Sequence, residues 1–300
     1  MSFLNSLLIK TIPFVPKPFI WSVAKKYIAG KNLNDVARTV RTLNSLNALA
    51  TIDVLGEDVF KTAETFVFRD SCIETLKTIY VQKLDSNLSL KLTQLGLKID
   101  KSLCEENLRE ILTVASQFSI FTRIDMEDSS CTDDTLEIFG NVKKNFPNVG
   151  IVIQAYLRRS ESDIKQLVSE KANVRLCKGI YIESEEIAFK DRVEIQENYL
   201  KLLEMLLSTK TYMGIATHDS HLIESAYSLI KKYNLQNSEF EFQMLLGVRR
   251  DLRNQIIANG NKIRIYVPYG EHWYAYSIRR MKENPELAEN IFKSFFGIYK

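Results

Sequence analysis

Two adjacent arginines near the C-terminus form the most informative candidate site in this 300-residue sequence. Arg279 and Arg280 follow Tyr276 by three and four positions, and Glu283 lies a further turn along, so a helix places all of them on one face. A guanidinium presents a planar fork of donors that matches a carboxylate. The pair therefore suits a small carboxylate ligand, and a solvated basic helix face is the alternative for an isolated pair.

The segment before this helix alternates like a strand. Ile263, Ile265 and Val267 share one face, and Pro268 and Gly270 end the run. Eight such runs occur, each with a polar residue near its end and a helical pattern after it. They end within 51–57, 88–96, 121–128, 149–156, 174–179, 213–219, 240–245 and 263–268, and the helical stretches include 104–118, 131–146, 161–171, 185–207 and 221–233.

Alternating strands and helices indicate a parallel sheet, and eight units of them in one domain predict an α/β fold of the (βα)8, or TIM, barrel type. Residues 1–45 are expected to form an N-terminal helical arm, and residues 46–300 the catalytic barrel with a C-terminal helix. In such barrels the chemistry lies at the C-terminal ends of the strands. Those ends carry titratable or hydrogen-bonding groups, namely Lys91, Asp125, Gln154, Arg175, Lys178, Thr217, His218 and Tyr266.

Composition excludes several classes of function. Forty basic and 37 acidic residues leave a net charge of +3, with no long basic run, which argues against nucleic-acid binding. The four cysteines have no C-x-x-C spacing and are expected to be reduced thiols, and the three histidines do not form a convincing metal site. Neither a G-x-G-x-x-G loop nor a G-x-S-x-G elbow is present.

The N-terminal segment is apolar but proline-broken, and no uninterrupted apolar run approaches the roughly 18 to 20 residues of a membrane span. It is a poor signal peptide, and no arginine-rich presequence precedes it, which favours a bacterial cytoplasmic location over a mitochondrial one. The arm is expected to pack on the fold. A peripheral contact with the inner membrane is a second role open to it. The sequence does not indicate an oligomeric state.

Three functions remain open from the residues alone. The cations at the strand ends suit a small anion together with a larger anionic cofactor. Lys91 or Lys178 could instead form a Schiff base in a lyase, although Gly179 after Lys178 indicates close backbone approach to a ligand. A non-catalytic barrel that binds an anion is the third.

Eight collinear motifs resemble the proline dehydrogenase family, and specifically its small monofunctional form. They are Asp53–Glu57, Leu90–Gly96, Arg123–Asp128, Gln154–Tyr156, Arg175–Tyr181, Ala216–Asp219, Phe240–Leu245 and Arg264–Gly270 with Arg279–Arg280, and they cover roughly residues 45 to 290. The resemblance implies a distorted barrel that holds FAD non-covalently and oxidises L-proline to Δ1-pyrroline-5-carboxylate. Hydride would pass to flavin N5 and the electrons to a membrane quinone, as the first step of proline catabolism to glutamate.

The resemblance also implies roles for individual residues. On the substrate side, Arg279, Arg280 and Lys91 would hold the proline carboxylate, with Asp125 paired to Lys91, while Leu245, Tyr266 and Tyr276 would wall the ring. On the cofactor side, Arg175 would lie by flavin N5, Met126 and Gln154 would contact the isoalloxazine, and Lys178, Gly179, Ile180, Thr217, His218 and Glu283 the rest of FAD. Glu57 would face Arg279 as an ion-pair lid.

Two departures from the family pattern stand out. Cys177 replaces a branched apolar residue, and the turn 269–276 is shorter than in long relatives. Relatives specific for 4-hydroxyproline carry a smaller residue where this chain has Tyr276, so dehydrogenation of that imino acid is the alternative within the family.

Replacing Arg279 or Arg280 with Met should raise the proline KM strongly while flavin content stays near normal. A carboxylate that loses a charged bidentate partner loses about 1.5 to 3 kcal/mol, which corresponds to roughly 10- to 150-fold. Steady-state kinetics measure this, and an unchanged KM in both variants would refute the assignment.

Overall fold

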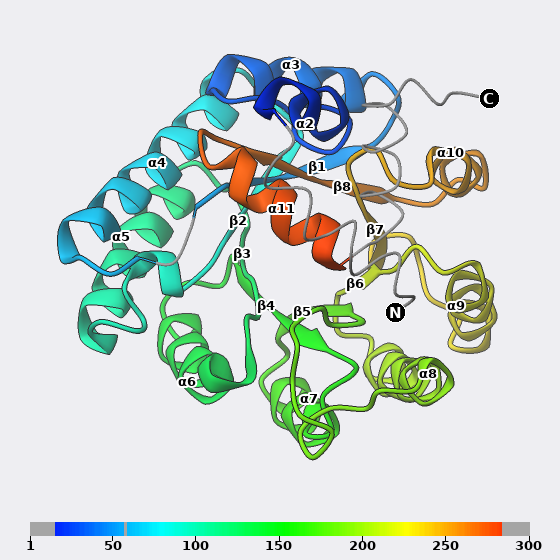
Figure 1. Ribbon diagram of the computed structural model, residues 1–300. Coiled ribbons are helices and arrows are strands. Elements are labelled where there is room, and N and C mark those ends of the chain that lie inside the picture. Colours follow the sequence, from blue (N-terminus) through cyan, green and yellow to red (C-terminus); the bar gives the residue numbers. More distant parts are fainter. Residues whose placement is uncertain (1–15, 57–58, 284–300) are drawn as a thin grey trace.

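Eight parallel strands close into a barrel in the order of the sequence (Figure 1). The computed structural model describes residues 16–56 and 59–283, with their side chains except at 23 and 279–283. The strands are β1 (Leu49–Val54), β2 (Ser86–Leu90), β3 (Thr122–Ile124), β4 (Val149–Gln154), β5 (Asn173–Cys177), β6 (Met213–Ala216), β7 (Phe240–Leu245) and β8 (Ile263–Tyr269). The predicted (βα)8 barrel is confirmed.

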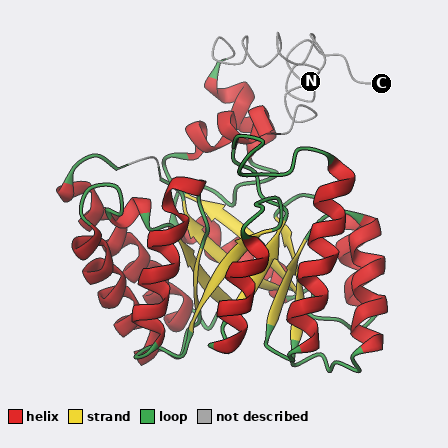
Figure 2. Cartoon of the chain, turned by 90° about the horizontal axis from the view of Figure 1, so that it is seen from below, coloured by secondary structure: helices red, strands yellow, loops and turns green. Residues whose placement is uncertain are grey.

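Helices surround the barrel and cover the outside of the sheet (Figure 2). They are α3 (Leu33–Asn44), α4 (Thr62–Val81), α5 (Lys101–Gln117), α6 (Thr132–Lys143), α7 (Ser160–Ser169), α8 (Arg192–Ser208), α9 (Ser220–Lys232) and α10 (Arg250–Ala258), with 3₁₀ turns η2 (Thr93–Leu95) and η3 (Ser129–Cys131). Many begin at a side-chain cap; the Asp100 carboxylate, for example, accepts the Leu103 N–H at the start of α5.

The helix expected over 185–207 begins only at Arg192. The Asp191 carboxylate accepts hydrogen bonds from the N–H groups of Val193 and Glu194 and so fixes the helix start. The residues before it run back along the β4–α7 connection, where the Phe189 N–H donates to the Tyr156 carbonyl at 2.8 Å. An apolar pattern alone does not separate such a docked loop from a first helical turn.

In most of the strands, apolar residues alternate with polar or small ones. Ile52, Leu88 and Ile151 belong to the apolar core that packs with the surrounding helices. The residues between them are polar or small, as with Asp53 and Ser89, which are register neighbours across β1 and β2. Because side chains alternate across a strand, the polar set points into the barrel, whose interior is charged rather than aliphatic.

Two helices from opposite parts of the chain meet over the barrel opening. Helix α11 (Trp273–Glu283) crosses the opening in Figure 1, and α2 (Lys17–Ala24) packs against it, with the rings of Trp21 and Trp273 4.8 Å apart. The buried ring of Tyr276 belongs to the same cluster. In the described ranges 16–56 and 59–283, no helix combines the length and apolarity that crossing a membrane requires.

Substituting Gly150 and Gly140 by Ala should change stability in opposite directions. A Cβ at Gly150, in β4, would lie 2.5 Å from Arg123 Nη1 and 2.6 Å from the Asn173 carbonyl oxygen, so we expect a loss of about 1–3 kcal/mol. A Cβ at Gly140, inside α6, would meet nothing within 4 Å, and we expect a gain of about 0.5–1 kcal/mol. Urea unfolding measures both, and the same sign for the two variants would contradict this packing.

Candidate functional site

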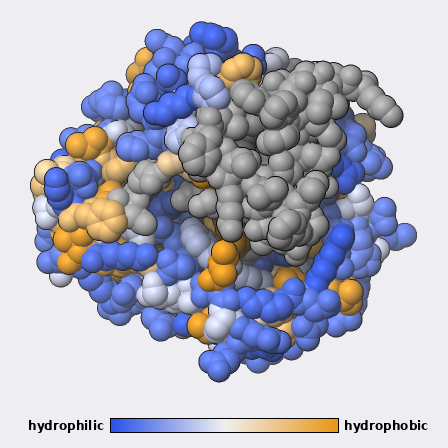
Figure 3. Space-filling model, viewed as in Figure 1, coloured by the Kyte–Doolittle hydropathy of each residue, from blue (hydrophilic) through white to orange (hydrophobic). Residues whose placement is uncertain are grey.

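A cavity of about 590 Å³ opens at the C-terminal ends of the strands. Every candidate residue whose side chain the structure describes lines it: Lys91, Asp125, Met126, Gln154, Arg175, Lys178, Gly179, Ile180, Thr217, His218, Leu245, Tyr266 and Tyr276. Glu57 lies outside the described residues, as do the side chains of Arg279, Arg280 and Glu283. On the face seen in Figure 3, the described residues that remain visible are mostly hydrophilic, with scattered apolar patches.

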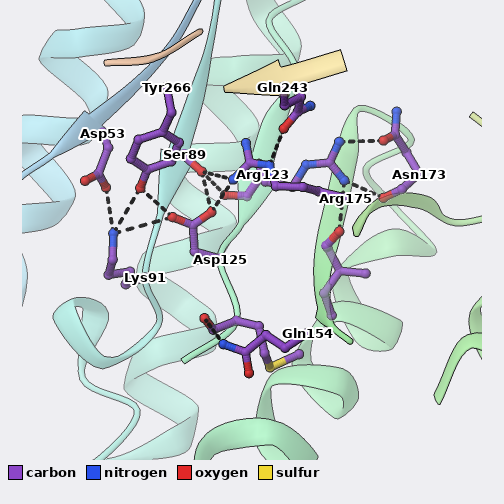
Figure 4. A network of polar contacts seen from close by, with 12 residues as sticks. Asp53, Ser89, Lys91, Arg123, Asp125, Gln154, Asn173, Arg175, Gln243 and Tyr266 are labelled. Carbon is purple, nitrogen blue, oxygen red and sulfur yellow. Dashed lines mark hydrogen bonds and ion pairs between the residues drawn. The ribbon is translucent and has the colours of Figure 1, made fainter. Parts of the chain in front are cut away.

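Asp125, just after β3, is the centre of a buried polar network (Figure 4). Its Oδ1 accepts hydrogen bonds from Ser89 Oγ at 2.6 Å and Arg175 Nη1 at 2.8 Å. Its Oδ2 accepts one from the Tyr266 hydroxyl at 2.6 Å. One carboxylate therefore joins groups from β2, β5 and β8, and fixes their relative positions inside the barrel.

Lys91, which follows β2, lies between two carboxylates (Figure 4). Its ammonium is 2.8 Å from Asp53 Oδ1 and 3.4 Å from Asp125 Oδ2, and it also lies 3.2 Å from the Tyr266 hydroxyl. The family resemblance implied Asp125 as its partner, and that ion pair is present. The shorter contact is to Asp53, a residue in the first motif for which the sequence had suggested no role.

The network shifts the titration of its members. Burial acts to lower the pKa of Lys91, but the charges of Asp53, Tyr266 and Asp125 outweigh it and hold that pKa well above its usual value. Burial acts to raise the pKa of Asp125, yet Lys91 and Arg175 hold it below its usual range. Burial raises the pKa of Asp53. Lys91 is thus a charged ammonium at neutral pH, which suits binding of an anion and opposes nucleophilic use of the amine.

Arg175, on β5, is held from a second side by a chain of polar groups deeper in the barrel. Its Nε donates to Gln243 Oε1 at 2.5 Å, and Gln243 Nε2 donates to Glu241 Oε1 at 2.7 Å. Arg264 Nε donates to the same oxygen of Glu241 at 2.6 Å. The Arg175 guanidinium also lies 5.4 Å from the centre of the Tyr266 ring. The cation is therefore fixed in place at the floor of the cavity.

The other part of the cavity carries groups able to hold a polar planar ligand. Gln154 Nε2 lies 3.4 Å from the Met126 carbonyl, while its buried Oε1 has no hydrogen-bond partner within the described residues. Gly179 has φ +100°, and a Cβ there would collide with the Tyr156 ring, so the chain after β5 needs glycine to pass this close. His218 Nε2 accepts the Leu245 N–H at 2.9 Å.

Asp53, Ser89 and Gln243 are among the members of this network that sequence reasoning missed. All three lie within strands, as Arg175 and Tyr266 also do. The signal that could have found them is the alternation of polar and apolar residues along β1, β2 and β7. The described residues contain no group of His, Cys, Asp or Glu arranged to hold a metal ion.

Comparisons with known proteins agree on one family. The family model described as "Proline dehydrogenase" matches residues 36–291. The chain is 41% identical over 277 residues to "Proline dehydrogenase 2" of Bacillus subtilis (strain 168), covering 92% of this chain and 90% of the relative. It is 33% identical over 274 residues to "Proline dehydrogenase" of Deinococcus radiodurans, covering 90% and 88% respectively.

Solved structures extend this likeness to the fold. Proline utilization A (PutA) from Bdellovibrio bacteriovorus, inactivated by N-propargylglycine, superposes with a TM-score of 0.83 at 26% identity and covers 88% of this chain. The chain spans 33% of the length of that PutA. A PutA mutant from Bradyrhizobium japonicum, at 18% identity and a TM-score of 0.76, shares the fold.

Cys177 should be the first thiol to react in the folded protein. Cys72, Cys104 and Cys131 are buried, whereas Cys177 is half-buried and lines the cavity. Burial raises the pKa of the Cys177 thiol to about 11, so alkylation by iodoacetamide should be slow at pH 7 and accelerate roughly tenfold per pH unit up to pH 10. Peptide mass mapping checks this against Cys177→Ser, and prior labelling of another cysteine would contradict it.

Proposed function

This chain belongs to the proline dehydrogenase family, and we propose that its barrel mouth binds L-proline beside FAD and oxidises it to Δ1-pyrroline-5-carboxylate. The observation that carries this proposal is the fixed network of Lys91, Asp125, Arg175 and Tyr266 on the cavity wall. It supplies cations for a substrate carboxylate and a preorganised positive charge for the reacting centre.

Lys91 and Tyr266 mark the substrate end of the cavity. The side chain of Lys91 is only 16% exposed and lines the cavity, and two carboxylates keep its ammonium charged. Tyr276 and Leu245 line the same space and would enclose the apolar ring of proline. On the sequence evidence, Arg279 and Arg280 of α11 would complete the carboxylate clamp from above. A buried carboxylate requires such paired cations.

Gln154, Gly179 and the adjacent loops suit the flavin. A flavin ring presents an N–H donor, and the unpartnered Gln154 Oε1 is an acceptor in need of one. Met126, Lys178, Ile180, Thr217 and His218 line the rest of this part of the cavity. When bound, FAD would supply the hydride acceptor. Arg175, held by Asp125 and Gln243, would stabilise negative charge that develops beside it.

The chain's own residues would act by orientation and electrostatics. The carboxylate clamp would fix the ring so that the carbon next to nitrogen faces the cofactor. The ring amine must lose its ammonium proton before that carbon gives up hydride, because the nitrogen lone pair drives the transfer. Electrons would then leave to a quinone, which would require a peripheral contact with the membrane that holds it.

The Schiff-base lyase is disfavoured by the ion pairs of Lys91. An amine nucleophile must be neutral, and the pKa of this ammonium is held well above its usual value by Asp53 and Asp125 once the opposing effect of burial is counted. A related imino acid, 4-hydroxyproline, stays as the second candidate substrate. The bulk of the buried Tyr276 beside the ring favours proline.

The visible spectrum of the purified protein, before and after adding L-proline, tests the proposed function. We expect the absorbance of an oxidised flavin and its bleaching on anaerobic addition of proline. A colourless protein that cannot be reconstituted with FAD, or a flavin that proline does not reduce, would refute it. Borohydride trapping of a proline adduct on Lys91 would instead support the lyase.

L-proline should be preferred over trans-4-hydroxy-L-proline, because Tyr276 leaves little room for a substituent on the ring. A packed wall rejects an added hydroxyl by about 1–3 kcal/mol, or roughly 10- to 200-fold. Tyr276→Ser should narrow the gap chiefly by lowering kcat/KM for proline. Steady-state kinetics with both substrates measure this, and equal efficiencies in the unmodified enzyme would show that Tyr276 does not select the ring.

A further inference from the structure

Asp53, on β1, is buried in the barrel with 1% of its surface exposed, and its carboxylate faces the Lys91 ammonium (Figure 4). Its Oδ1 makes the shortest ion pair of the Lys91 ammonium, at 2.8 Å. Its Oδ2 is buried with no hydrogen-bond partner within the described residues. Burying a carboxylate with one oxygen unpaired opposes folding, so stability does not explain this residue.

Asp125 is the weaker of the two carboxylate partners of Lys91. Both of its oxygens already accept short hydrogen bonds, from Ser89, Arg175 and Tyr266. Its distance to the ammonium is 3.4 Å, against 2.8 Å for Asp53. Asp125 therefore holds Arg175 and Tyr266 in place and makes a longer contact with Lys91, whereas Asp53 accepts the shortest hydrogen bond of Lys91.

We propose that Asp53 is a positioning residue that holds the Lys91 ammonium, charged and aimed, for the substrate carboxylate. This inference rests on the proposed function, in which Lys91 binds that carboxylate. Asp53 stands on the side of Lys91 away from the cavity: it is absent from the cavity wall, whereas Lys91 lines it. Asp53 thus acts through Lys91 and is not itself a contact of the substrate.

The charges around Lys91 determine how loss of Asp53 would change the pKa of Lys91. The titratable groups that interact with Lys91 are Asp53 on β1, Cys72 of α4, Asp125 after β3, Glu127 and Tyr266 on β8. Arg175 on β5 interacts with Asp125. Burial acts to lower the pKa of Lys91, and Asp53 is the strongest opposing charge. Without it, Lys91 should lose its proton within an accessible pH range.

The test measures binding of cyclopentanecarboxylate, which has a ring and a carboxylate but no amine to titrate. Perturbation of the flavin spectrum of the holoenzyme reports its Kd from pH 6.5 to 9.5. In the unmodified enzyme the Kd should stay flat over this range. In Asp53→Asn it should be raised at least tenfold at high pH and should climb about tenfold per pH unit above the new pKa of Lys91, while approaching the parent value at low pH.

Matched variants distinguish loss of the Asp53 charge from a change in its position and from a general disturbance of strand β1. Thr51→Val removes another buried, unpartnered polar group two residues earlier on the same strand, and should leave the Kd unchanged at every pH. Asp53→Glu keeps the charge but moves it, so its Kd should be raised and flat with pH. It also serves as the test variant if Asp53→Asn does not fold. Adding Asp53→Asn to Lys91→Met should change the Kd no further.

The outcomes are distinct. A Kd for Asp53→Asn that matches the parent, or that is raised equally at all pH values, overturns the role of Asp53. A Kd for Asp53→Glu that matches the parent value, or that depends on pH, also overturns the role of Asp53. A further loss of affinity when Asp53→Asn is added to Lys91→Met would also overturn that role, because Asp53 would then act by a route other than Lys91. If Lys91→Met binds the carboxylate as well as the parent does, the proposed substrate site fails instead, whatever Asp53 does.

Discussion

The charges buried inside the barrel are the constraint on which the rest of this structure depends. Three ion pairs in a row connect Asp53, Lys91, Asp125 and Arg175, and a hydrogen bond joins Arg175 to Gln243. A charge taken out of water is costly unless it is paired and hydrogen-bonded. Each strand must therefore keep its register, because a shift by one residue would turn these groups toward the apolar layer outside.

Small residues make room for this network. Beside the side chains of Arg123 and Gln243 lie Gly150 and Gly214, where a Cβ would collide with those side chains. Aliphatic side chains fill the interiors of many barrels of this type, whereas here guanidinium and amide groups take that space. The result is a rigid polar floor under the cavity. Rigidity is useful in a site that acts mainly by orientation and charge, because the groups need not reorganise when the ligand arrives.

The mouth of the barrel is built from both ends of the described chain. The Ala29 N–H donates to the Pro268 carbonyl at 2.9 Å, and the Gly270 N–H donates to the Gly30 carbonyl at 3.1 Å. These bonds tie the segment after α2 to the segment before α11. The aromatic contact between Trp21 and Trp273 continues the same junction. The helix that carries Tyr276 is thereby held over the cavity by residues that lie some 250 positions earlier in the sequence.

The sequence by itself determined the repeating strand and helix units, the closed barrel and the cavity residues that stand at the strand ends. Each of these depends on local chemistry: alternation marks a strand, a polar end marks the mouth, and eight units close the sheet. It also carried the family resemblance, because eight motifs occur in a fixed order. Local pattern placed the start of α8 wrongly, since a capping aspartate and a docked loop decide that boundary.

Only the tertiary structure decided which charge faces which. The family resemblance implied Asp125 as the partner of Lys91, and that ion pair is present at 3.4 Å, but the fold gives Lys91 a closer contact with Asp53 and also joins Asp125 to Arg175, Ser89 and Tyr266. Strand pattern tells that a residue points inward, but not how far the tilted strands are staggered or which neighbours reach one another across the barrel. Ion pairs between strands depend on that stagger, which closure of the whole barrel sets.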